Sequence, residues 1–350
     1  MRLMGSFVKL RKQADSLLRG FVEESDAWRD LASSSPDIFR NIKKYCLADG
    51  KRLRPVLFMA SYQAYKGEPM PASLGIVPVA LELLHGFVLI HDDLVDRAEQ
   101  RRNKPSLQRQ LNSLFGRRLG HSTGEDIALV SGDLLYALAM RIFLQAPVGP
   151  ELQLAGMARL TDTALLTGRG ELLEMLATAK NLDSLDEESL FEIYDFKTSH
   201  YSFCCPMILG ALFSERSGRT EEALLTRIGL AAGRAFQIAD DVDDILSSAN
   251  KSSSDLVERR RTLLLLWTRE RVKLREKRMI DKCLAMDEPL NSEMSSLMKD
   301  LICTSGALDY ARARSLACKK EALSLLPKLH VSRQGREKLE DIIDCVLSID

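Results

Sequence analysis

Two groups of three aspartates share the spacing DDxxD at distant points of the chain. The groups are Asp92, Asp93 and Asp96, and Asp240, Asp241 and Asp244. On a helix this spacing crowds three carboxylates together, which is repulsive unless cations are present. One such group is also typical of a solvated helix end. Two groups with the same spacing instead favour a paired site on facing helices, where carboxylates hold several magnesium ions together with water and substrate phosphates. The ligand that such a site implies is a diphosphate.

Further polar residues extend both groups along a helix face. Glu82 and His85 precede Asp92 at helical spacing, in positions where a core-facing stripe would be apolar. Gln237 and Gly233 continue the second stripe one and two turns before its aspartates. Each group is therefore the end of a longer stripe on one helix face, which is polar at Glu82, His85 and Gln237.

Phosphate-binding cations are expected near such a site. Arginine makes planar bidentate contacts with phosphate oxygens, whereas lysine acts as a compact point charge. The basic run from Arg97 to Arg118 has a second interpretation as a solvated or RNA-contacting loop. It contains only Phe115 as an aromatic stacking residue, and the 49 basic and 49 acidic residues of the chain cancel, so we expect no nucleic-acid partner. The candidate cations are Lys51, Arg52, Arg54, Arg101, Arg102 and Lys197.

Most of the chain has the hydrophobic periodicity of helices. Strand-like alternation is absent, and 20 glycines and 11 prolines are few for 350 residues. With 45% hydrophobic residues the chain can bury a sizeable core. The turn signals between segments are short, which favours one all-α domain over residues 1–350. Helices are predicted over Ile38–Leu47, Arg54–Tyr65, Val77–Asp96, Asp126–Leu144, Leu152–Thr167, Glu188–Leu212, Glu221–Leu246, Thr262–Leu284 and Ser315–Leu326.

The seven cysteines and the chain start indicate a cytoplasmic protein. The cysteines form no CxxC pair, so we expect reduced and mostly buried thiols. Residues Met1–Phe21 lack the unbroken apolar core of a signal peptide and resemble an amphipathic helix. The longest apolar stretch, Ile76–Ile90, is interrupted by Glu82 and His85, so no transmembrane segment is expected.

Short motifs follow one another in order along the chain. They are GKRLRP at 50–55, ExxHxxxLxxDD at 82–93, RRGxPT at 101–106, GDxL from Gly132, KT at 197–198 and FQxxDDxxD at 236–244. Asn103 and Ser106 are substitutions within RRGxPT. The ordered set resembles the trans-isoprenyl diphosphate synthase (polyprenyl synthetase) family over about residues 41–266. The resemblance implies an isoprenoid synthase helical bundle around a deep apolar cavity, with the aspartates at its mouth.

The resemblance also implies an activity and roles for these residues. The activity would be head-to-tail condensation of isopentenyl diphosphate with an allylic diphosphate, by a homodimer that uses three magnesium ions per site. Lys51, Arg54, His85 and Arg102 would bind isopentenyl diphosphate, and Asp92, Asp96 and Asp240 would be the principal metal ligands. The allylic diphosphate would be bound by Arg101, Lys197 and Gln237. From its own chemistry, Thr198 is expected to bond the carbonyl four residues earlier and so bend its helix.

Two parts of the sequence depart from the family pattern. The loop after the second aspartate group is short and lacks the usual GK pair. Lys251 is its remaining candidate lysine, and Arg260 stands where a later lysine is usual. The family's GQ pair is replaced by Gly170-Glu171.

The length of the product depends on what closes the floor of the cavity. Each buried methylene contributes about 0.8 kcal/mol, so only a steric stop ends chain growth. Phe87 lies five residues before Asp92 and is the candidate floor, with Val88 and Leu84 as neighbours. This pattern resembles short-chain synthases that form geranylgeranyl diphosphate. Phe87 as an ordinary core residue is the alternative.

Two other functions remain open from the sequence. A class I terpene cyclase shares the bundle and the first motif, but it carries an Asn/Asp, Ser/Thr, Glu triad in place of the second. Here the second group is a full DDxxD, and Asn291-Ser292-Glu293 lacks the helical spacing of that triad. A non-catalytic regulatory subunit of a heteromeric synthase would be expected to lose aspartates, and this chain keeps all six.

Overall fold

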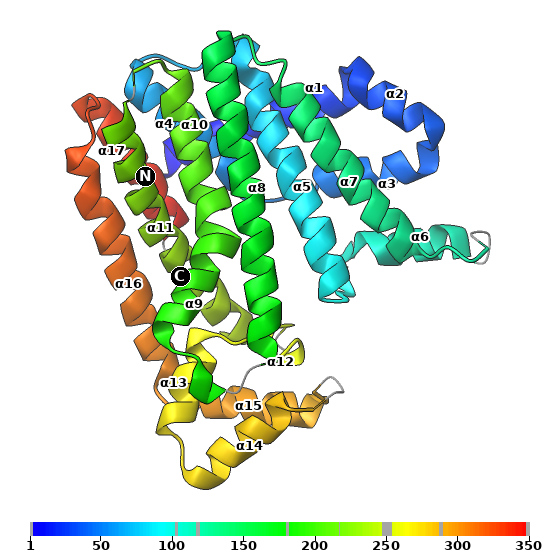
Figure 1. The fold of residues 1–350 in the computed structure, drawn as a ribbon, viewed down its shortest axis with the longest axis vertical. Helices are drawn as coiled ribbons and strands as arrows, with labels where there is room; N and C mark the ends of the chain where they lie inside the picture. The colour runs from blue at the N-terminus through cyan, green and yellow to red at the C-terminus, as the bar shows by residue number, and fades with distance from the viewer. Residues whose placement is uncertain are drawn as a thin grey trace. The chain divides into compact units, whose positions relative to one another are not determined.

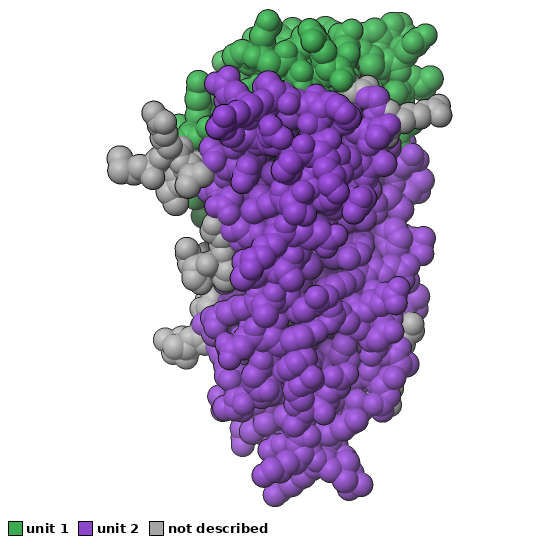
Figure 2. Space-filling model, turned by 90° about the vertical axis from the view of Figure 1, so that its left-hand side faces the viewer, with its two compact units in different colours: residues 1–158, 209–216 green, residues 159–208, 217–350 purple. Residues whose placement is uncertain are grey.

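The structure is a computed structural model that describes residues 3–101, 104–116, 120–179, 182–216, 218–246, 254–286 and 290–347. Internal contacts divide the chain into two compact units. Unit 1 contains residues 1–158 and 209–216, and unit 2 contains residues 159–208 and 217–350. Figure 2 distinguishes the two units by colour. The predicted all-α class is confirmed, whereas the single domain over residues 1–350 stays a prediction.

Unit 1 is built around the long apolar helix α5. This helix packs along α7, α4 and α1, as the ribbons in Figure 1 show. Phe58 of α4 is fully buried and its ring lies edge-on to that of Phe213, 6.2 Å away. The elements of unit 1 are α1 (Leu3–Glu24), α2 (Asp26–Ser34), α3 (Pro36–Cys46), α4 (Leu53–Lys66), the 3-10 turn η1 (Ala72–Gly75), α5 (Ile76–Val95), β1 (Gln100–Arg101), β2 (Lys104–Pro105), α6 (Leu107–Phe115), α7 (Gly124–Phe143) and the start of α8 (Pro150–Thr178).

The segment Ala72–Val95 is long and apolar enough to cross a membrane by length and composition alone. In its most apolar window, 67% of the residues are buried inside the protein. It also contains the buried Glu82, whose carboxylate pairs with Arg52 at 2.9 Å. These are the surroundings of a core helix, and the absence of a membrane span stays an expectation.

Unit 2 is centred on the long helix α11, which packs along α16 and along a π-helical segment (Figure 1). Its apolar core includes Ile238 and Val242 of α11 and the leucines of α13. After the remainder of α8, its elements are η3 (Leu182–Ser184), α9 (Glu187–Tyr194), the π-helix η4 (Asp195–Cys204), α10 (Cys205–Phe213, shared with unit 1), α11 (Arg219–Leu246), α12 (Ser254–Val257), α13 (Leu263–Arg271), α14 (Leu274–Leu284), α15 (Ser292–Thr304), α16 (Ala307–Leu325), η5 (Leu326–Lys328) and α17 (Arg333–Val346).

The predicted helices are present, but several boundaries were wrong. The expected helix 188–212 is α9, a π-helix and α10 in succession, and the expected helix 262–284 breaks at Val272, which is extended. Helix α8 continues to Thr178, well past the predicted end at Thr167. A short hairpin that the periodicity did not predict pairs Arg101 with Lys104. All seven cysteines are free thiols, and five of them are buried.

Candidate functional site

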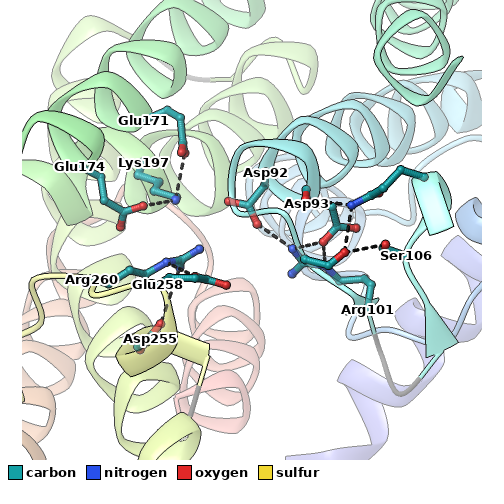
Figure 3. A network of polar contacts seen from close by, with 12 residues as sticks. Asp92, Asp93, Arg101, Ser106, Glu171, Glu174, Lys197, Asp255, Glu258 and Arg260 are labelled. Carbon is teal, nitrogen blue, oxygen red and sulfur yellow. Dashed lines mark hydrogen bonds and ion pairs between the residues drawn. The ribbon is translucent and has the colours of Figure 1, made fainter. Parts of the chain in front are cut away.

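The first aspartate group lies at the C-terminal end of α5 in unit 1, and its members differ in environment. Asp93 is fully buried and accepts hydrogen bonds from the Tyr45 hydroxyl at 3.0 Å and from Arg101 Nε at 2.7 Å. Asp92 is partly accessible and accepts from Arg101 Nη2 at 2.7 Å (Figure 3). Asp96 is half-buried one turn later. Asp92 and Asp96 thus lie on one helix face, while Asp93 points into the protein.

Electrostatics hold Arg101 as a permanent cation beside this group. Burial raises the pKa of Asp93, while Arg101 and Tyr45 act in the opposite direction. Burial lowers the pKa of Arg101, but Asp92 and Asp93 more than offset this, so that the net shift is upward. The hairpin that carries Arg101 is fixed by Ser106, whose hydroxyl donates to the Ala98 carbonyl at 2.7 Å.

The loop before α4 corrects one candidate cation. Arg52 is 5% exposed and has the left-handed φ of +50°. Its guanidinium donates to Glu82 at 2.9 Å, to Asp15 at 2.7 Å and to the Ala48 carbonyl at 2.8 Å. The guanidinium is buried and bonded to groups inside the protein, so Arg52 and Glu82 support this loop from within and Arg52 does not face solvent.

The other predicted ligands of isopentenyl diphosphate surround this support. Lys51 is exposed on the loop, Arg54 is buried in the first turn of α4, and His85 is half-buried on α5. Helices α4 and α5 pack against each other, so these three residues belong to one region of unit 1. Arg102 lies outside the described residues.

A basic pocket that sequence reasoning missed opens beside the hairpin. Its volume is about 540 Å³, and Arg101 and Tyr45, which both contact Asp93, are part of its wall. Arg40 pairs with Asp37, and Lys43 pairs with Glu23. The signal in the sequence was the cluster of cations on the last turns of α3. The lining residues are Arg40, Lys43, Lys44, Tyr45, Leu47, Ala48, Asp49, Arg101, Lys104, Pro105 and Gln110.

The second aspartate group lies near the end of α11 in unit 2. Asp241 is 4% exposed and accepts from the Tyr194 hydroxyl at 2.5 Å and from Gln237 Nε2 at 2.9 Å. Burial raises the pKa of Asp241 to about 7, although both hydrogen bonds act to lower it. Asp240 is exposed, and Asp244 accepts from the backbone N–H of Asp255 at 3.1 Å.

The two groups therefore share an arrangement. In each, the second aspartate is buried and held by a tyrosine hydroxyl, Tyr45 or Tyr194, while the first remains partly or fully accessible. Sequence reasoning missed both tyrosines, because each lies more than forty residues from its aspartate.

The accessible carboxylates suit magnesium. Magnesium takes few carboxylates and completes its shell with water and phosphate oxygens, so a closed protein cage is not required. Within the described ranges, no three His, Cys, Asp or Glu side chains are already gathered as a metal site. In unit 1, Asp92 and Asp96 lie one turn apart and suit this open kind of ligand set. In unit 2, the exposed Asp240 offers a carboxylate of the same kind.

Thr198 does not act as predicted. Its hydroxyl donates to Gln237 Oε1 at 2.7 Å rather than to the carbonyl four residues earlier. Thr198 lies instead in the π-helix, where the Ser199 hydroxyl donates to the Tyr194 carbonyl five residues before it, at 3.2 Å. The Thr198–Gln237–Asp241 chain of hydrogen bonds still joins three predicted site residues in unit 2.

Two glycines make room for the π-helix. A Cβ atom on Gly233 of α11 would lie 2.5 Å from Ser199 Cα, and one on Gly170 of α8 would lie 2.7 Å from Lys197 Cα. Backbone can approach this closely only where the facing residue is glycine. The backbone of Lys197 therefore packs directly against α8, and that of Ser199 against α11.

The basic candidates of unit 2 are already paired with acids. Lys197 lies 2.9 Å from Glu171 and also contacts Glu174 (Figure 3). Arg260 pairs with Glu258 at 2.8 Å and lies 3.8 Å from Asp255. Lys251 lies outside the described residues.

The candidate floor residue Phe87 packs within unit 1. Its ring centroid is 4.5 Å from that of His91 and 5.1 Å from that of Tyr136 on α7. Phe87 and Val88 are half-buried, whereas Leu84 is 4% exposed. Tyr136 is a neighbour that the sequence did not predict.

Comparison with known proteins places this helical fold among the prenyl diphosphate synthases. A geranylgeranyl pyrophosphate synthase from Corynebacterium glutamicum, solved with isoprenyl diphosphate and magnesium, superposes with a TM-score of 0.85 at 20% identity over 99% of both chains. The polyprenyl synthetase family matches residues 36–301. The chain belongs to this family, and the predicted enzyme class, a prenyltransferase, is confirmed.

Two relatives are similar along most of their length. The geranylgeranyl diphosphate synthase of Methanosarcina mazei is 30% identical, over 90% of this chain and 87% of that protein. The geranylfarnesyl diphosphate synthase of Natronomonas pharaonis is 28% identical, over 90% of this chain and 91% of that protein.

Proposed function

We propose that this enzyme condenses isopentenyl diphosphate with an allylic diphosphate in a magnesium-dependent reaction, and that its main product is geranylgeranyl diphosphate. The observation that carries the proposal is the repeated arrangement of the aspartates. Asp93 and Asp241 are buried and bonded to tyrosines, whereas Asp92, Asp96 and Asp240 are at least partly accessible and can bind metal ions. Three magnesium ions per site, as the family resemblance implies, belong to this proposal.

The residues of the chain have separable tasks in this reaction. Magnesium, when bound, neutralises the departing diphosphate and so favours ionisation of the allylic substrate. Lys197 and Gln237 bind the allylic diphosphate, while Arg101 orients Asp92 through its hydrogen bond. Lys51, Arg54 and His85 of unit 1 bind isopentenyl diphosphate. Apolar walls of the expected cavity keep water away from the allylic cation.

Product analysis with the purified chain tests this proposal. The chain alone is incubated with magnesium, isopentenyl diphosphate and each of the dimethylallyl, geranyl and farnesyl starters, and the products are separated by chromatography. We expect geranylgeranyl diphosphate from all three. Cyclic hydrocarbons formed from a single diphosphate would identify a terpene cyclase, and no turnover without a second protein would identify a regulatory subunit.

We further propose that the enzyme is a homodimer formed through α8. Four leucines of this helix are 60–73% exposed, and apolar side chains gathered in this way mark an interaction surface. Their spacing by nearly whole helical turns places them on one face. A second copy of the same face is the simplest cover for them. The leucines are Leu154, Leu165, Leu172 and Leu176.

A further inference from the structure

Lys197 is held at both its ends by one short stretch of α8. Its backbone lies against Gly170, where a Cβ atom would come within 2.7 Å of Lys197 Cα. Its ammonium lies between the carboxylates of Glu171 and Glu174, as Figure 3 shows. The three side chains are only 17–24% exposed, so water screens these charges incompletely.

This arrangement reduces the attraction of Lys197 for an anion. Two carboxylates beside one ammonium offset its positive charge, which weakens its attraction for a diphosphate. The backbone is held in place, because it packs directly against Gly170 and the adjacent Thr198 is bonded to Gln237 at 2.7 Å. Only side-chain rotation can free the ammonium, and the long lysine and glutamate side chains permit this rotation.

We propose that Glu171 and Glu174 are positioning residues that compete with the allylic diphosphate for Lys197 and thereby weaken binding of both this substrate and the released diphosphate. The inference rests on the proposed function, because that function assigns Lys197 to the allylic diphosphate. Its consequence is a faster release of inorganic diphosphate, at the expense of a higher Michaelis constant for the allylic substrate.

Neutral variants of the two glutamates test the competition. In E171Q, E174Q and the double variant, we expect the KM for the allylic substrate to fall about fivefold or more, with the double variant lowest. Inhibition by inorganic pyrophosphate should tighten in parallel. The KM for isopentenyl diphosphate should not change. The matched control is E192Q, which removes a carboxylate paired with Arg169 at 3.0 Å in the same unit and should leave all three quantities unchanged.

A lysine-free background separates this role from a structural one. In K197M, the same glutamate substitutions should no longer change the allylic KM, because they act through the ammonium. An unchanged or raised allylic KM in the double variant, or an equal effect in K197M, would overturn the inference. Calorimetric titration of inorganic pyrophosphate with magnesium measures the same competition without turnover. A wild-type chain that binds pyrophosphate but forms no prenyl product would contradict the proposed function alone.

Discussion

The neighbouring aspartates of each DDxxD group have different physical roles. Asp93 and Asp241 are buried and saturated with donors from tyrosine, arginine or glutamine, whereas Asp92 and Asp240 retain accessible oxygens. A buried carboxylate without partners would be strongly destabilising, so these donors are a condition of the fold. The spacing of the aspartates was visible in the sequence. Their division into inward and outward members was not, because it depends on donors from distant helices.

Alanine variants separate the two roles. Asp92→Ala and Asp240→Ala should lower turnover on the order of a hundredfold or more, with nearly unchanged thermal unfolding. Asp93→Ala removes one hydrogen-bond acceptor of Tyr45 and one of the two carboxylates of Arg101, and should reduce stability by about 1–3 kcal/mol. Turnover and circular dichroism melting on the same preparations measure both effects. Equal losses of stability in the Asp92 and Asp93 variants would contradict the division of roles.

Product length is also decided by single residues. If Phe87 closes the cavity, Phe87→Ala opens space for a further isoprene unit, whose burial is favourable at about 0.8 kcal/mol per methylene. We expect products longer than geranylgeranyl diphosphate from this variant. Tyr136→Ala should give a smaller shift, because Tyr136 supports the Phe87 ring from α7 at 5.1 Å. Chromatography of the chain lengths is the measurement, and an unchanged distribution for Phe87→Ala would make Phe87 an ordinary core residue.

At the scale of elements, helices could be predicted where one hydrophobic face gives the sequence a clear helical period. The predicted start of Val77–Asp96 and the end of Glu221–Leu246 agree with α5 and α11 to within a residue. The π-helix was not predictable from its own sequence, since its path depends on Gly170 and Gly233 in two other helices. The missed hairpin is only two residues per strand, too short for a period-two pattern.

A pair of glycine variants tests how the π-helix is accommodated. Gly233→Ala would place a methyl group 2.5 Å from Ser199 Cα, and such overpacking typically costs about 1–3 kcal/mol. Gly168→Ala on α8 has nothing within 4 Å, so it should instead stabilise the protein by about 0.5–1 kcal/mol through helix propensity. Urea unfolding measures both. A stable Gly233→Ala protein with full activity would show that the close contact is not required.

A cluster of ion pairs made by Asp183, Arg269, Asp281 and Lys277 joins η3, α13 and α14 and has a defined pH dependence. The buried Arg269 contacts Asp183 and Asp281, and its hydrogen bonds lower the pKa of Asp183 from 3.8 to about 2. A carboxyl group whose pKa is lowered by folding stabilises the folded protein at pH values above the pKa that the group has in the unfolded chain. This contribution disappears as the pH falls through 4 towards 2. Asp183→Asn should therefore lower the melting temperature at pH 6 and have little effect near pH 2. A melting difference that does not shrink on acidification would exclude this pair as its source.

At the scale of the whole molecule, composition and periodicity were sufficient for the all-α class, and the ordered motifs were sufficient for the family. They did not predict two compact units, because unit 1 takes up residues 209–216 from within the second half of the chain. Nor did they predict the length of α8, whose end beyond Thr167 has little hydrophobic periodicity. That helix is apolar on its core side and also on its exposed face.

The exposed leucines of α8 give the last prediction, on the state of assembly. A dimer would bury the exposed apolar area of Leu165 and Leu172. Each Å² of apolar area that is buried stabilises the dimer by about 25 cal/mol. A glutamate at either position would instead bring like charges together across a two-fold axis. We expect wild-type protein to have twice the chain mass of 39.2 kDa in light scattering, and L165E/L172E to have the mass of one chain. Leu274→Glu, at a leucine 64% exposed on α14, is the matched control and should leave the dimer intact. A wild-type monomer, or a double variant that remains dimeric, would show that this face is not the interface.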